Sequence, residues 1–215
     1  MGVQTVEDLR ESVKAIRRSG RPLSEMELTQ TSYWIEQSDR RKLILSGFNQ
    51  PLTATDVARR SGIGRDSCLH HLWNLTLRGV LRCLNQDTRF NRLYTLTKLG
   101  HACQRRLKVT CGLTSAGYHE PDVPWDLYSS ICYRHRAAVI ESLREPMQAA
   151  TVKRKARLGD STLRMSANNV RDVMRYLLQK QIARRVTIRK KKHPRYELTE
   201  LGREFQRLLF NVRAR

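Results

Sequence analysis

Long apolar runs, cysteine pairs and aromatic clusters are all missing from this sequence of 215 residues. No stretch approaches the ~20 apolar residues of a transmembrane helix, so we expect no integral membrane protein. The five cysteines are scattered and form no Cys-x-x-Cys pair, which argues against a secreted disulfide framework and a cysteine-only zinc site. The N-terminus resembles neither a signal peptide nor a transit peptide, so a cytoplasmic location is expected.

Catalytic signatures are missing as well. The chain has no Ser/His/Asp set, paired-carboxylate motif, glycine-rich phosphate loop or Walker pattern. The metal candidate is Cys68-x-His70-His71, but Cys68 is expected to face the core and the histidines to face elsewhere, so the ligands do not converge. Aromatic residues make up 7% of the chain and are spread thinly, which does not indicate a stacking groove for single strands. We expect a protein that is not an enzyme and that carries no metal or cofactor.

Positive charge dominates what is present. Lysine and arginine number 41 against 20 aspartates and glutamates, a net charge of +21. The excess lies in two blocks: residues 38–107 hold 13 basic and 4 acidic side chains, and residues 126–215 hold 22 and 8. Residues 1–37 and 108–125 are close to neutral. A field of this size attracts polyanions, with nucleic acid the first candidate and an anionic membrane surface the second.

The chain also repeats itself. Residues 94–107 recur 102 positions later as residues 196–209, and 8 of the 14 positions are identical. The offset falls to 95 further upstream, so the second copy carries about seven extra residues within 157–165. We therefore predict two homologous domains, at 38–107 and 126–215, with an N-terminal helical extension at 1–37 and a linker at 108–125.

Each copy predicts three helices, a hairpin and a closing helix, from the spacing of apolar residues and from the caps Thr53 and Ser166. In the first copy we expect helices at 32–47, 55–60 and 65–78, strands at 81–84 and 93–96, and a helix after Thr97. In the second copy we expect helices at 126–144, 150–156 and 167–180, strands at 184–188 and 195–198, and a helix after Thr199. The residues expected to face the core on the third helices are Cys68, Leu69, Leu72, Leu75, Val170, Met174 and Leu177. Core or domain packing is expected for Trp34, Trp73 and Trp125.

This order of elements is that of a winged helix-turn-helix. The predicted fold class is mainly α with small β-hairpins, arranged as two winged helix-turn-helix domains in tandem. The runs Arg78-Gly-Val-Leu-Arg82 and Tyr94-x-Leu-Thr-x-Leu-Gly100 resemble the wing of the MarR, ArsR and PadR groups of regulators, and residues 180–202 resemble it again. The resemblance implies DNA-binding regulation. Those groups usually carry one unit per chain and dimerise, whereas this chain carries two and has the extra residues before its second recognition helix.

The third helix of such a domain enters the major groove, where arginine suits guanine and asparagine suits adenine. The candidate DNA contacts on these helices are Arg65, Ser67, His70, His71, Asn74, Asn168, Asn169, Arg171 and Arg175. The wing tips can follow the phosphate backbone or enter the minor groove. Their candidate contacts are Arg89, Arg92, Arg189, Lys190, Lys191, Lys192 and Arg195. The cations of the second helix, Lys153, Arg154, Lys155 and Arg157, are either phosphate clamps or ordinary surface charge.

We expect double-stranded DNA as the partner and transcriptional regulation, by repression at an operator, as the function of a nucleoid-associated cytoplasmic protein. One alternative is a DNA- or RNA-binding structural subunit of a larger nucleoprotein complex in replication, a mobile element or defence. Another is recognition of double-stranded RNA or Z-form duplex by the same fold. Apolar stripes in residues 1–37 (Val6, Leu9, Val13 and Ile16 in the first) either cover the first domain or form a homodimer interface.

Overall fold

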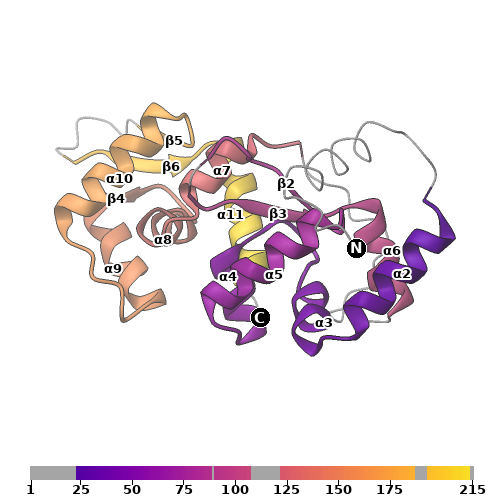
Figure 1. Cartoon of the computed structure of the whole chain (residues 1–215). Coiled ribbons are helices and arrows are strands. Elements are labelled where there is room, and N and C mark those ends of the chain that lie inside the picture. Colours follow the sequence, from indigo (N-terminus) through magenta and orange to yellow (C-terminus); the bar gives the residue numbers. More distant parts are fainter. Residues whose placement is uncertain (1–22, 89, 108–121, 187–192, 214–215) are drawn as a thin grey trace. The chain divides into compact units, whose positions relative to one another are not determined.

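The structure is a computed structural model that describes residues 23–88, 90–107, 122–186 and 193–213 (Figure 1). The chain divides into two compact units, unit 1 (Met1–Trp125) and unit 2 (Asp126–Arg215). The described residues are mainly helical, with a small three-stranded antiparallel sheet in each unit. This confirms the predicted class, mainly α with small β-hairpins. The first N-terminal helix expected from the sequence and most of the expected linker lie outside the described residues.

The two units repeat one order of elements: helix, helix, strand, helix, helix, strand, strand, helix. The first copy consists of α2 (Glu25–Glu36), α3 (Asp39–Ser46), β1 (Leu52–Thr53), α4 (Ala54–Ser61), α5 (Arg65–Leu77), β2 (Leu81–Cys83), β3 (Leu93–Leu96) and α6 (Lys98–Arg106). The second consists of α7 (Trp125–Ile131), α8 (Arg134–Ser142), β4 (Met147–Gln148), α9 (Ala149–Gly159), α10 (Ala167–Gln179), β5 (Ala183–Val186), β6 (Arg195–Leu198) and α11 (Glu200–Arg213).

Each hairpin gains a third strand that the sequence did not indicate. The sheet orders are β1-β3-β2 and β4-β6-β5, so the last strand of each unit is central. Leu52 pairs with Tyr94, and Met147 pairs with the corresponding Tyr196. With two residues each, β1 and β4 are too short to show the alternation by which a strand is recognised in a sequence.

The helices predicted at 32–47 and 126–144 are each broken in two, which corrects the prediction of continuous helices. In unit 1 the break falls at residues 37–38, where the side chain of Ser38 caps α3 by accepting from the Arg41 amide. The Arg41 guanidinium donates to the carbonyl of Trp34 near the end of α2 and lies over the Trp34 ring. In unit 2, the Arg136 guanidinium likewise donates to a carbonyl near the end of the preceding helix, that of Ser130 in α7, at 2.8 Å. Each arginine satisfies a carbonyl that the broken helix leaves without an intrahelical partner.

The identical residues of the repeated segment hold its last helix in place. Thr97 caps α6 and its hydroxyl donates to the carbonyl of Gly79 at 2.5 Å. Thr199 donates to the carbonyl of Gln181 at 2.7 Å. Gln104 donates to the carbonyls of Leu45 and Phe48 at the end of α3, and Gln206 makes the matching pair of bonds at the end of α8. These residues, which are identical in the two copies, therefore have a structural role, because each of them bonds to the backbone of its own unit.

The turn before each hairpin takes the left-handed conformation. Gly79 has φ +70° and Gln181 has φ +55°. Glycine adopts this region without strain, whereas a glutamine in it is not predicted by any pattern in the sequence. The turn is the same in both units, so the tertiary structure imposes it on Gln181.

The extra residues of unit 2 form a turn that is fixed to the rest of the unit. The guanidinium of Arg134 contacts the Asp160 carboxylate through two nitrogens at 2.7–2.9 Å, and Leu163 and Met165 are buried. The hydrogen bonds from Arg134 and Thr162 hold the pKa of Asp160 below its ordinary value. The extension therefore leaves α10 free to take the position that α5 has in unit 1. Both helices are 13 residues long and lie 102 residues apart in the chain.

Removing the cap of α10 should weaken unit 2 measurably. The Ser166 hydroxyl accepts from the Asn169 amide, and the Asn169 side chain accepts from the Ser166 amide, a complete capping box. We expect Ser166→Ala to lower the free energy of unfolding by about 1 kcal/mol in denaturant titrations. Ser24→Ala is the matched control, because Ser24 occupies the same position before α2 without a side-chain cap bond. An equal effect of the two substitutions would contradict the role of the capping box.

Candidate nucleic-acid interface

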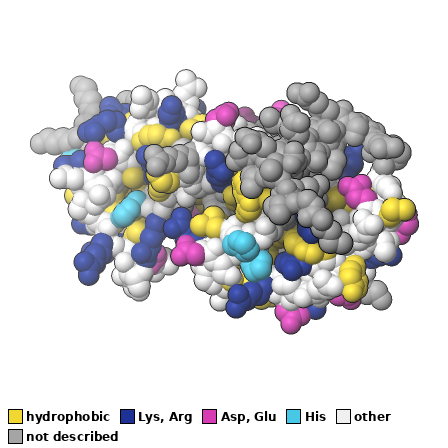
Figure 2. Space-filling view, in the orientation of Figure 1, with side chains coloured by type: hydrophobic (Ala, Val, Ile, Leu, Met, Phe, Trp, Pro, Cys, Tyr) yellow, Lys and Arg dark blue, Asp and Glu magenta, His cyan; other side chains and the backbone are white. Residues whose placement is uncertain are grey.

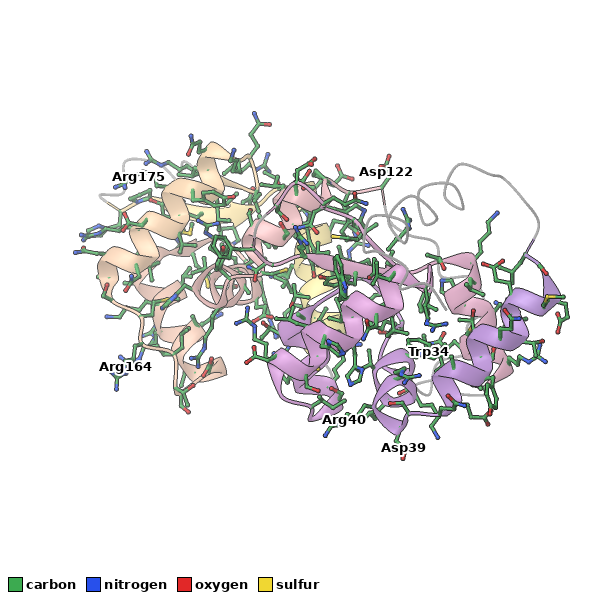
Figure 3. The ribbon with its side chains drawn as sticks, viewed as in Figure 1. Trp34, Asp39, Arg40, Asp122, Arg164 and Arg175 are labelled. Carbon is green, nitrogen blue, oxygen red and sulfur yellow. The ribbon has the colours of Figure 1, made fainter. Side chains whose placement is uncertain are left out.

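The outer face of α10 is polar and basic. Asn168, Arg171 and Arg175 are exposed, while Val170 and Met174 on the other side of the helix are buried. Arg175 projects from α10 into solvent (Figure 3). It pairs with Asp172 at 3.0 Å, but both side chains are mostly exposed, so the pair contributes little to stability. Little free energy is therefore lost when Arg175 leaves Asp172 to bind another anion.

Asn169 has a structural role beside the one predicted for it. Its Oδ1 atom accepts from the amide and the hydroxyl of Ser166, at 2.9 and 2.6 Å. A carbonyl oxygen has two lone pairs, so only the side-chain NH2 group remains for another partner. Asn168 is less committed, since its Oδ1 accepts from Arg171 at 3.4 Å. Bidentate recognition of adenine needs both the oxygen and the nitrogen, and therefore fits Asn168 better than Asn169.

A groove of about 900 Å³ runs beside α10 in unit 2. It lies between α9, the first half of α10 and residues 193–196 at the start of β6. Apolar side chains, among them Leu158, Val170 and Pro194, contribute to its lining, and none of its described lining residues is acidic. The basic side chains of its lining are Lys153, Arg154, Arg157, Arg171 and His193. Figure 2 shows lysine and arginine side chains over this part of unit 2.

The geometry of the groove suits a chain of negative charges. Arg154 and Arg157 are exposed on α9, one turn apart, and Arg171 faces them from the adjoining α10. The N-terminus of α10, which adds the positive end of a helix dipole, lines the same hollow at Ala167. Cations from two helices and a helix N-terminus together can bind several phosphates of one strand. Lys155, also considered from the sequence, pairs with Glu145 at 3.1 Å and is absent from the described lining.

The predicted contacts of unit 1 divide into exposed and half-buried residues. Arg65 and His70 are exposed on α5, whereas Ser67, His71 and Asn74 are half-buried. Ser67 accepts from Arg40 of α3 at 3.5 Å, and Asn74 is within 3.0 Å of the His70 ring. The structure thus presents Arg65 and His70 to solvent and ties the other three residues partly to the unit itself.

His71 lies against the basic α3 helix and is unfavourable as a cation. Its Nδ1 atom is buried and has no hydrogen-bond partner among the described residues. Burial, followed by the charges of His70, Arg40 and Arg41, lowers the pKa of His71. We therefore expect a neutral ring at pH 7, which would add no positive charge to α5. Figure 3 labels Arg40 of α3 and Trp34 of the neighbouring α2.

One apolar residue of α5 contradicts its predicted position. Leu69 was expected in the core but is 38% exposed, and Trp73, for which core or domain packing was expected, is 43% exposed. Cys68, Leu72 and Leu75 fill the core side of the helix instead, as predicted. A helix turns by about 100° per residue, so Leu69 points about 100° away from the buried Cys68, toward the uncovered side of α5.

The other tryptophans also lie outside the closed core. Trp34 is half-buried, and the guanidinium groups of Arg41 and Arg78 lie 3.9 and 4.2 Å from its ring centre. Trp125 is half-buried as well. Trp34 therefore joins α2, α3 and the end of α5 by stacking between cations, a packing role that differs from burial in an apolar core.

The turn of the first hairpin is held by its own side chains. Buried Asn85 donates to the Thr88 hydroxyl at 2.6 Å and accepts from the Leu93 amide at 2.7 Å. Arg92 is exposed and donates to the Thr88 carbonyl at 3.2 Å. In unit 2, Arg195 is half-buried in β6. The other predicted wing residues, Arg89, Arg189, Lys190, Lys191 and Lys192, lie outside the described residues.

Cys68 lies in the core, as predicted. Its side chain is fully buried, and its sulfur is 3.7 Å from the Ser61 hydroxyl. In the described part of the chain, no three His, Cys, Asp or Glu side chains come together as ligands for a metal ion. None of the helices described here has both the length and the apolar content needed to cross a membrane.

No family model matches the chain, and no curated protein matches it.

Proposed function

We propose that the protein is a double-stranded DNA-binding transcriptional regulator that acts as a repressor, and that each unit is a winged helix-turn-helix. In this proposal α5 and α10 are the recognition helices, and the hairpins β2–β3 and β5–β6 are the wings. The order of elements, repeated in both units, supports the fold assignment. The basic blocks at 38–107 and 126–215 coincide with the two copies and supply the charge that DNA binding needs.

The observation that carries the proposal is the groove of unit 2. Its cations come from α9 and α10, and the base-reading candidates Asn168 and Arg171 stand on the same α10. A strand of DNA in this groove would have its phosphates against α9 while α10 reaches base edges. Phosphate contacts would set the position of the protein, and base contacts would set the preferred sequence.

Selection from a random duplex library tests the proposal. The wild-type chain should return a motif with two separately mutable blocks, one for each recognition helix. Arg65→Ala and Asn168→Ala should each relax the preference at one or two positions, because a lost base contact costs about 1–3 kcal/mol of discrimination. Binding to unrelated duplex should change much less, since phosphate contacts dominate that mode.

The same experiment separates the regulator from its rival. A structural subunit of a nucleoprotein complex would bind duplexes according to length with little preference, so selection without a motif would replace the regulator by this second function. A motif that neither substitution alters would show that other residues read the bases. Arg203→Ala is the control: it is an exposed arginine of α11 and is not a groove residue in the described lining.

A further inference from the structure

The helices α5 and α10 can be compared position by position. Both have 13 residues, and the offset of 102 that relates the two copies also relates the two helices. It pairs Cys68 with Val170 and Leu72 with Met174, and all four side chains are buried. Because the buried faces correspond, the exposed faces correspond as well.

At two of these exposed positions, an apolar side chain of α5 corresponds to an arginine of α10. The offset places Leu69 on Arg171 and Trp73 on Arg175. All four side chains are exposed. Leu69 and Trp73 are four residues apart and therefore neighbours on one side of α5. Where α10 presents two guanidinium groups, α5 presents an apolar strip.

Two arginines lie near the N-terminal end of this apolar strip. Arg65 is exposed at the start of α5, and Arg40 of α3 reaches the same end of the helix through its contact with Ser67. Asp66 is the acidic residue of the first turn. An exposed apolar strip on a basic unit suits a partner that carries negative charge and also offers small apolar groups. Duplex DNA has both, because each thymine carries a C5-methyl group in the major groove.

We infer that Leu69 is a specificity-determining residue that contacts thymine methyl groups, with Trp73 extending the same contact one turn further along α5. The inference rests on the proposed DNA-binding function. Leucine has no hydrogen-bonding group, so it cannot read a base by donors and acceptors, but it can shield a methyl group from water. The two blocks of the binding site then differ: unit 1 selects thymine by apolar contact, and unit 2 selects guanine or adenine through Arg171 and Asn168.

Replacing thymine by uracil tests this inference directly, because uracil lacks only the methyl group. A random duplex library made with thymine and one made with uracil are each selected on the full chain, and affinities for the recovered sequences are measured. The wild type should bind the thymine form about fourfold more tightly for each methyl contacted. The loss should fall in one block of the motif, while the block read by unit 2 keeps its preference.

Leu69→Ala should remove most of the difference between thymine and uracil while general duplex binding persists. Leu69→Arg, which copies the position of Arg171, should shift the preference of that block toward guanine. Leu43→Ala is the control, since Leu43 is a 46% exposed leucine on α3 of the same unit and should leave the thymine preference intact.

The outcomes separate this inference from the proposed function. A motif with equal binding of thymine and uracil forms, or an unchanged difference in Leu69→Ala, overturns the thymine contact and leaves DNA binding standing. Failure of the wild type to bind any duplex overturns both. If Leu69→Ala changes the mass in sedimentation and leaves the thymine preference unaltered, the strip is a protein interface, which also overturns the inference.

Discussion

Gly202→Ala should destabilise unit 2 strongly. A methyl group on Gly202 would lie 2.1 Å from the carbonyl oxygen of Ile182 and 3.1 Å from the Cβ of Leu198. Both are atoms of the main chain or next to it, so no side-chain rotation relieves the overlap. We expect a loss of about 3 kcal/mol or more in the free energy of unfolding, the upper part of the range for overpacking. Gly100→Ala should do the same to unit 1, where the added methyl would lie 2.2 Å from the Val80 carbonyl oxygen.

Hydrogen exchange resolved by peptide is the measurement that locates each effect. Gly202→Ala should raise exchange in α8–α11, and Gly100→Ala should raise it in α2–α6. Gly159→Ala is the matched control at the end of α9, where an added methyl meets nothing within 4 Å. The control should change stability by less than about 0.5 kcal/mol. A Gly202→Ala protein as stable as this control would show that the contact between α11 and the turn at residues 181–182 yields easily.

Replacing Arg154 and Arg157 by glutamine should weaken binding to all duplexes by about 30-fold at 0.15 M salt. This value assumes that each arginine neutralises one phosphate, which contributes about 0.9 to the slope of log affinity against log salt concentration. The slope itself should therefore fall by about 1.8. Titrations at several salt concentrations measure both quantities. Sequence preference should change little, because phosphate contacts are the same for every base pair.

The matched control for this pair lies on α11 of the same unit. Arg203 and Arg207 are also exposed, and neither is among the described residues that line the groove. Their replacement by glutamine removes the same total charge, so it corrects for the long-range field of the protein. Equal slopes for the two double variants would assign the effect to net charge and would exclude the groove of unit 2 as the phosphate site.

Much of the local structure follows from the sequence because it depends on short-range chemistry. Thr53, Ser166, Thr97 and Thr199 were recognised as caps, and each side chain makes its cap bond. Such bonds join residues three apart, so they are set by neighbours in the chain. The alternation of apolar residues predicted the two hairpins. The repeat predicted that the second unit has the same order of elements as the first. Charge is additive along the chain, and it indicated a polyanion as the partner.

The tertiary structure decided what depends on contacts far apart in the chain. The breaks at residues 37–38 and 132–133 rest on arginines that bond back to the preceding helix, and β1 and β4 exist only because β3 and β6 offer a free edge. The groove needs α9, α10 and the start of β6 together. Leu69 was predicted to be a core residue because it is apolar. Apolar character alone does not show which side of a helix packs against the rest of the unit. The rotation of Leu69 away from Cys68 is fixed by packing, and that places it on the surface proposed to meet DNA.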